Sequence, residues 1–176
     1  MHYQIKIITN DLLWLNNILK HNIPNSEITI HYRDNENKII LFSEGTKTDR
    51  QYVLSKFNTK YDCFYSIKDE SNGGGVRIQS PFMVTVSNRK SVGNIIWGVF
   101  NTQESIKSIE IKFHNKNSSS FAIYPEVKDN IFVYYAHESY KTINFFEGSW
   151  SYDIKAFDNV GNIILDEKNL NIPGIF

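Results

Sequence analysis

The side chains that most often carry enzyme chemistry are spread thinly through this sequence. The five histidines are His2, His21, His31, His114 and His137. None forms a His-x-x-x-His pair and none belongs to a His-Glu-x-x-His set, the spacings that place two imidazoles on one helical face to bind zinc. We therefore predict no metal site, and we expect lone histidines on polar strand faces to be solvated.

The carboxylates fall mainly where the chain is expected to turn, and aspartate favours turns because its side chain bonds the backbone nearby. The carboxylates in such positions are Asp34, Glu36, Asp69, Glu70, Asp129, Asp158 and Asp166. A glycosidase needs two carboxyl groups roughly 5 to 9.5 Å apart across a cleft, a separation set by the fold. A hydrolase whose carboxylates converge only in the folded chain, or one that pairs a carboxylate with His31 or His137, is therefore the alternative function.

Other catalytic and cofactor signatures are missing from the sequence. Gly73-Gly74-Gly75 lacks the Lys-Ser/Thr of a phosphate loop and leads into no expected helix, so it is predicted to be a turn. No Gly-x-Ser-x-Gly elbow is present, and the single cysteine, Cys63, is expected to be a small buried residue. The sequence predicts no cofactor and favours a non-catalytic role over an enzyme.

Aromatic residues are the remaining candidates for function. They cluster in the irregular segment before Gly148, as Tyr134, Tyr135, Tyr140, Phe145 and Phe146. Adjacent residues of a strand point to opposite faces, so a sheet core cannot bury all of them. The exposed ones are candidates for binding a protein or stacking on a sugar, whereas in the alternative interpretation these rings simply cover the end of the core.

The amino-acid composition indicates a folded, mainly β protein and argues against some classes of partner. Hydrophobic residues make up 41% of the 176 residues, enough for a folded core, and the 19 basic and 19 acidic residues cancel. Without excess positive charge there is no general attraction to nucleic acid, which we exclude as a partner. Aromatic residues make up 14% of the chain and favour strands, so a mainly β protein is expected. No apolar run is long enough for a transmembrane helix.

The N-terminal half is predicted to be one helix and a small antiparallel sheet. Asn10 or Asp11 is a suitable N-cap for a helix to about His21, with Leu12, Leu15 and Leu19 at helical spacing. From Ser26 the period changes to two, and a hairpin is expected to turn at residues 34–37. Further strands are expected at residues 51–57 and 61–67.

The C-terminal half is predicted to be a β-sandwich-like domain, and its last hairpin carries the strongest pattern. Trp150, Tyr152, Ile154 and Ala156 fall on one face of a strand, and residues 158–162 supply the turn. An earlier strand alternates in the same way, with Ile109, Ile111 and Phe113 inward and Glu110, Lys112 and His114 outward. Residues 121–124 and 131–135 are expected to continue a meander, and Trp97 and Trp150 are predicted to be core residues.

The two halves are expected to meet near residue 87. The segment Ser87-Asn88-Arg89-Lys90-Ser91 is polar and lacks a hydrophobic anchor, as interdomain linkers often do. We therefore predict domains at residues 1–87 and 88–176.

Four segments of the second half resemble a known pattern. They are residues 96–100, 106–111, 131–135 and the stretch Tyr152-Asp153-Ile154-Lys155-Ala156-Phe157-Asp158 with Gly161-Asn162-Ile163-Ile164. This pattern is similar to that of small uncharacterised β-domain proteins of Bacillus-like Gram-positive bacteria, which are often exported or lipid-anchored. The resemblance covers about half of the chain and implies a β fold and a bacterial source. It implies no catalytic residue, because every position that carries it is a strand or turn residue.

These observations lead to one expected function. We expect a non-catalytic interaction or structural module that binds a protein or a cell-surface polymer through sheet faces or aromatic loops. The first ten residues show no signal peptide or lipidation cysteine, so the sequence as it stands indicates a soluble protein, and the cytoplasm is expected if no export signal precedes Met1. An extracytoplasmic or cell-surface location is expected instead if an export signal precedes Met1.

Overall fold

The protein is described from a computed structural model, and the chain divides into two compact units, Met1–Ile78 and Gln79–Phe176. The structure describes residues 27–45, 50–60, 64–67, 76–77, 81–89, 92–115, 120–141, 143–145 and 150–172. The helix predicted for residues 10–21 lies outside these ranges. Within them the protein is mainly β, and all the strands pair antiparallel, as the sequence predicted.

The boundary between the two units lies at residues 78 and 79 of the sequence, before the expected position near residue 87. Ser87, Asn88 and Arg89 end a strand and pair with Ile95, Asn94 and Gly93 of the next one. Their polar side chains suggested a linker, but backbone pairing in a hairpin does not require apolar side chains. Residues 87–89 therefore end a strand.

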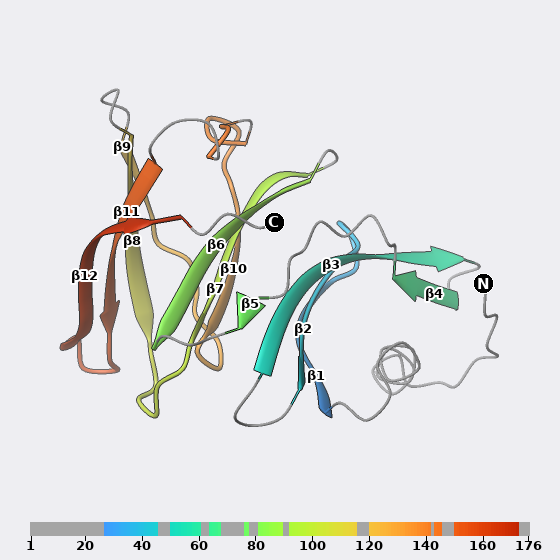
Figure 1. Ribbon diagram of the computed structural model, residues 1–176, viewed down its shortest axis with the longest axis horizontal. Helices are drawn as coiled ribbons and strands as arrows, with labels where there is room; N and C mark the ends of the chain where they lie inside the picture. Colours follow the sequence, from blue (N-terminus) through green and yellow to red (C-terminus); the bar gives the residue numbers. More distant parts are fainter. Residues whose placement is uncertain are drawn as a thin grey trace. The chain divides into compact units, whose positions relative to one another are not determined.

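The first unit contains a five-stranded antiparallel sheet (Figure 1). Its strands are β1 (Glu27–Asp34), β2 (Ile39–Gly45), β3 (Arg50–Lys60), β4 (Phe64–Ile67) and β5 (Val76–Arg77). The order is β1-β2-β3-β4, with β5 paired to β3. The expected first turn is confirmed, because Asp34 Oδ1 accepts the amides of Glu36 and Asn37 at 2.8 and 2.9 Å. Ile28, Ile40, Phe42 and Phe57 form a buried cluster on this sheet.

The second unit begins with a three-stranded sheet in the order β10-β7-β6. Its strands are β6 (Phe82–Arg89), β7 (Gly93–Phe100) and β10 (Ile131–Tyr135). Strand β7 is buried from Asn94 to Phe100, which explains its continuous apolar sequence. Trp97 is fully buried, as predicted, and its indole N–H donates to Ser87 Oγ at 3.1 Å.

The other sheet of this unit has four strands in the order β12-β11-β8-β9. They are β8 (Ser108–Asn115), β9 (Ser120–Ile123), β11 (Trp150–Phe157) and β12 (Ile163–Asn171). The predicted terminal hairpin is confirmed by the pairing of β11 with β12. In its turn, Asp158 Oδ1 accepts the amides of Val160 and Asn162. Gly161 has a φ of 89°, which a β-branched residue adopts only with strain.

The expected meander through residues 121–135 was wrong. Strand β9 pairs with β8, but β10 pairs with β7, so the chain passes from one sheet to the other between them. The physical reason lies at β7, where Phe132 of β10 sits opposite Gly98, and the glycine leaves room for the ring. The alternation of apolar and polar residues within β10 does not reveal that this strand pairs with β7.

One buried cluster contains side chains from both sheets of the second unit. Val84, Ile96 and Phe132 of the three-stranded sheet share it with Ile111 and Ile154 of the four-stranded sheet. Trp150 belongs to the same cluster and is 8% exposed, which confirms its predicted core position. Since alternate residues of β8 and β11 enter this core, their intervening residues must lie on the opposite face.

Candidate functional site: the polar face of the four-stranded sheet

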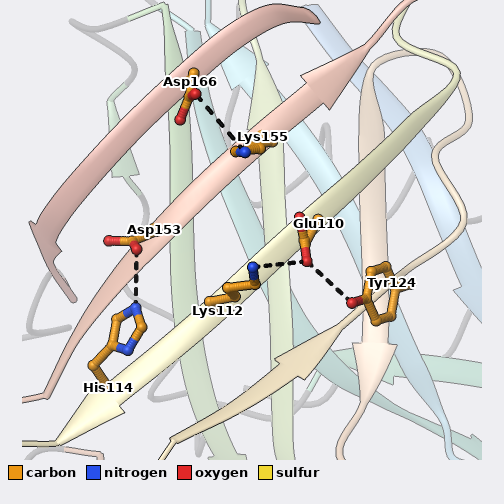
Figure 2. A network of polar contacts seen from close by, with 7 residues as sticks. All are labelled: Glu110, Lys112, His114, Tyr124, Asp153, Lys155 and Asp166. Atoms are coloured by element: carbon orange, nitrogen blue, oxygen red, sulfur yellow. Dashed lines mark hydrogen bonds and ion pairs between the residues drawn. The ribbon is translucent and has the colours of Figure 1, made fainter. Parts of the chain in front are cut away.

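The candidate site is the face of the β12-β11-β8-β9 sheet that points away from the shared core. It comprises Glu110, Lys112 and His114 of β8, Asp153 and Lys155 of β11, Asp166 of β12, and Tyr124 just after β9; we call it the polar face. Figure 2 shows these side chains with their mutual contacts. The predicted outward positions of Glu110, Lys112 and His114 are confirmed by alternating burial along β8.

Tyr124 and Lys112 both bind the carboxylate of Glu110. The Tyr124 hydroxyl donates to Glu110 Oε1 at 3.0 Å, and Lys112 Nζ lies 3.2 Å from the same oxygen (Figure 2). The hydrogen bond to Glu110 and the negative charge of Glu110 raise the pKa of the Tyr124 phenol above its ordinary value. Glu110 thus fixes the position of an exposed aromatic ring.

Asp153 joins three strands through one carboxylate. Its Oδ2 lies 3.0 Å from His114 Nε2 of β8, and its Oδ1 accepts the amide of Asn169 of β12 at 2.9 Å. Asn169 has a φ of 55° where the β11–β12 register shifts, so the bond holds a bulge in this edge strand. Partial burial alone would raise the pKa of Asp153. The bonds from Asn169 and His114, with the charges of His114 and Lys168, outweigh it and lower that pKa.

Opposite charges are neighbours throughout the polar face. Asp153 sits opposite Lys112, and Lys155 sits opposite Glu110, in the β11–β8 register. Lys155 Nζ also lies 4.0 Å from Asp166 Oδ2 (Figure 2). Each charge therefore has a partner within the face, which gives the surface a polar character without a strong field of either sign.

The polar face does not provide the parts of a metal site. In the described ranges, no group of three or more His, Cys, Asp or Glu side chains could hold a metal ion. Its carboxylates are bound by hydroxyl, ammonium, imidazole and amide groups. The arrangement is suited to hydrogen bonding with a ligand, because Lys112 keeps 49% of its side chain exposed and His114 keeps 38%.

The aromatic residues predicted to bind a ligand are distributed between the core and its edge. Phe145 is a core residue, 3% exposed, and its ring lies 5.2 Å from Trp150, so it is not accessible to a partner. Tyr140 stacks on Phe121 with 4.0 Å between ring centroids. Tyr134 packs partly against the same core, Tyr135 is half-buried, and Phe146 lies outside the described residues. Of these five residues, Phe145 therefore lies within the core, Tyr134 packs against it, and Tyr140 stacks on a ring that packs against it.

Asn94 fixes the loop that carries Tyr140. Its buried side-chain amide donates to the carbonyl oxygens of Tyr140 and Ile143 at 2.9 and 2.8 Å, and its Oδ1 accepts from Asn88. The backbone of Asn94 also accepts from Ala136 at 3.0 Å. This loop is therefore tied to β7 at both ends.

The two histidines considered for a hydrolase, His31 and His137, each contact a serine side chain. His31 Nε2 lies 2.8 Å from Ser43 Oγ, a contact that resembles a nucleophile and its base. Ser43 is fully buried, however, so a substrate cannot reach its hydroxyl. His137 is exposed and contacts Ser139 of its own loop at 3.3 Å.

Sequence reasoning missed Tyr124 and the His114–Asp153 pair. Tyr124 follows β9 at a position where the period of two, counted from Ser120 and Ala122, places it on the polar face. That count could have placed Tyr124 on the polar face from the sequence alone. No sequence pattern could have predicted the contact of His114 with Asp153, because it depends on how β8 aligns with a strand more than thirty residues away.

The described ranges contain no helix that is long and apolar enough to cross a membrane. Comparison of the chain with protein-family models, with curated proteins and with solved structures found no match.

Proposed function

We propose that this chain is a non-catalytic interaction module that binds a protein or polymer through the polar face of its C-terminal unit. The observation that carries the proposal is the exposed, hydrogen-bonded row formed by Tyr124, Glu110 and Lys112 on a broad sheet. A rigid sheet holds such groups more precisely than a loop does. The residues first considered for catalysis have structural contacts, which favours binding over turnover.

We also propose that the C-terminal unit is β-sandwich-like. The shared cluster supports this arrangement, because Val84, Ile96 and Phe132 come from one sheet while Ile111, Ile154 and Trp150 come from the other. Two sheets that pack face to face leave their outer faces for other contacts. A sandwich accounts for the strict alternation of burial in β11.

A cell-surface location is part of the same proposal. It rests on the resemblance of the second half to exported β-domain proteins of Bacillus-like Gram-positive bacteria. In that location a cell-surface polymer is an available partner, and a surface without net charge approaches it without a dominant charge repulsion.

A charge-swap variant tests the proposed function. Glu110→Lys with Lys112→Glu keeps the net charge but removes the anchor of Tyr124, and both positions lie outside the core. We expect the wild type to be retained on immobilised cell-wall polymer or on a protein partner, and the folded variant to elute. Neither should hydrolyse a panel of glycoside and ester substrates.

The alternative function, a hydrolase, makes the opposite prediction. Asp153 with His114 is the carboxylate–histidine pair that such an enzyme could use, with 3.0 Å between Oδ2 and Nε2. Substrate turnover that disappears in Asp153→Asn, with equal retention of wild type and charge-swap variant, would replace the proposal with an enzyme.

A further inference from the structure

Outside β4, whose side chains are not described, Tyr124 is the one exposed aromatic residue of the described ranges. It is 69% exposed, whereas the other Phe, Tyr and Trp residues of those ranges are buried or half-buried. An aromatic ring left in water in this way does not contribute to the core. Tyrosine offers a flat apolar ring together with a polar end, the combination found repeatedly at binding sites.

The ring is held in place before any ligand arrives. Ile111 pairs with Ile123, so the next residues, Glu110 and Tyr124, lie side by side on the polar face. The hydroxyl bond to Glu110 then fixes the ring, and Lys112 fixes Glu110 (Figure 2). The preceding outward residue of β9 is Ala122, which lies opposite Lys112 and has a small side chain. Holding a side chain in its bound position reduces the entropy lost on binding.

The charges around Tyr124 select the class of ligand. A single-stranded nucleic acid would also stack on an aromatic ring, but it requires a positively charged groove. Here Glu110 is paired with Lys112, and Lys155 with Asp166. A protein interface would have to remove water from these ion pairs at a considerable cost. The hydroxyl groups of a sugar both donate and accept, so they can replace that water.

From this arrangement we propose that the polar face binds a neutral oligosaccharide, with one pyranose ring stacked on Tyr124 and its hydroxyls bonded to Glu110 and Lys112. The inference rests on the proposed function and names its ligand class. Lys155 and Asp166 continue the same row across the sheet, so a chain of several sugar units fits the surface better than a monosaccharide. No covalent step is involved.

Isothermal titration of the full chain with cellohexaose, maltohexaose and hexaacetylchitohexaose tests the inference. We expect one of the three to bind saturably at micromolar to millimolar concentration. Tyr124→Ala should weaken that binding about tenfold or more, because truncation of a stacked ring removes a principal contact. Tyr124→Phe keeps the ring and should lose only a few-fold. Val160→Ser, a change at another exposed apolar residue, is the matched control and should bind as the wild type does.

Several outcomes would overturn the inference. One is the absence of saturable binding by all three oligosaccharides, and another is equal affinity of the wild type and a folded Tyr124→Ala variant. Binding of an oligothymidylate that weakens steeply with salt would identify a charged polymer as the ligand. If retention on a protein partner is lost in the charge-swap variant while no sugar binds, the carbohydrate inference fails and the proposed function stands. If both binding tests fail, the proposed function fails as well.

Discussion

The ring of Phe132 lies against Gly98, its partner on the neighbouring strand. A Cβ atom added to Gly98 would come within 2.5 Å of Cε1 of Phe132 and would also meet the carbonyl oxygen of Met83. Both obstacles are on buried strands, and one is backbone, so neither can move aside without distorting the sheet. This close approach joins β7 to β10 and fixes the strand that the sequence alone misplaced.

Gly98→Ala should therefore destabilise the protein although alanine favours strands no less than glycine does. Overpacking of this kind costs about 1 to 3 kcal/mol. Urea unfolding followed by circular dichroism measures the change, and Ser108→Ala, at an exposed strand position, is the control that should stay within about 0.5 kcal/mol. Equal stability of Gly98→Ala and wild type would show that Phe132 does not rest on this glycine.

Asn94→Ala should release the loop that carries Tyr140. The change removes two hydrogen bonds to the carbonyls of Tyr140 and Ile143 and leaves those oxygens without the amide donor. We expect a loss of about 2 to 4 kcal/mol, since each buried polar group left without a partner costs about 1 to 3 kcal/mol. Hydrogen exchange of the amides of residues 137–143 should accelerate. Asn88→Ala, which removes only a partly exposed contact to Asn94, is the control, and equal effects of the two variants would contradict the tether.

Stability should fall at alkaline pH because of Tyr152. Burial raises the pKa of its phenol to about 12, whereas an unfolded tyrosine titrates near an ordinary value of about 10. Between these values the unfolded chain loses the proton that the folded chain keeps, so rising pH favours unfolding by up to about 1.4 kcal/mol per pH unit. The pH dependence of urea unfolding from pH 9 to 12 should be shallower in Tyr152→Phe. Parallel curves for the two proteins would mean that the phenol is not buried.

Trp150→Ala should be among the most damaging single changes in the second unit. Trp150 is 8% exposed, and the centroid of its ring lies 5.2 Å from that of Phe145 and 6.1 Å from that of Phe121. Deleting a buried large aromatic costs roughly 3 to 5 kcal/mol. Denaturant unfolding gives the loss of stability, and acrylamide quenching of wild type and Trp150→Phe gives the accessibility of the indole. Free quenching together with wild-type stability of the alanine variant would place Trp150 on the surface.

Local sequence patterns were sufficient to predict the terminal hairpin and the faces of its first strand. The alternation of Trp150, Tyr152, Ile154 and Ala156 with polar residues placed the first group in the core, and Asp158 with Gly161 placed the turn. These features depend on neighbours within a few residues. The same local reasoning mistook Ser87 to Arg89 for a linker, since polar side chains on a hairpin resemble those of a linker.

The site depended on contacts between distant parts of the chain. The polar face brings Glu110 beside Tyr124 and His114 beside Asp153, and no local pattern reports that alignment. For the aromatic cluster, the sequence predicted only that some of its rings are exposed, because adjacent residues of a strand point to opposite faces. The ring of Phe145 lies in the core beside Trp150 and Phe113. Whether a residue outside the strands is buried depends on how the two sheets pack around it. The sequence alone does not give the distance between the sheets.

The most direct test of the account is to map where a ligand binds by amide chemical shifts of the isotope-labelled full chain. The polar face is the proposed surface, so titration with the oligosaccharide that binds in calorimetry should shift amides of β8, β9 and β11 around Glu110, Tyr124 and Asp153. The amides around His31 and Ser43, and those of residues 134–145, should stay in place. Saturable shifts confined to residues 134–145, or around His31 and Ser43, would contradict the polar face as the binding surface.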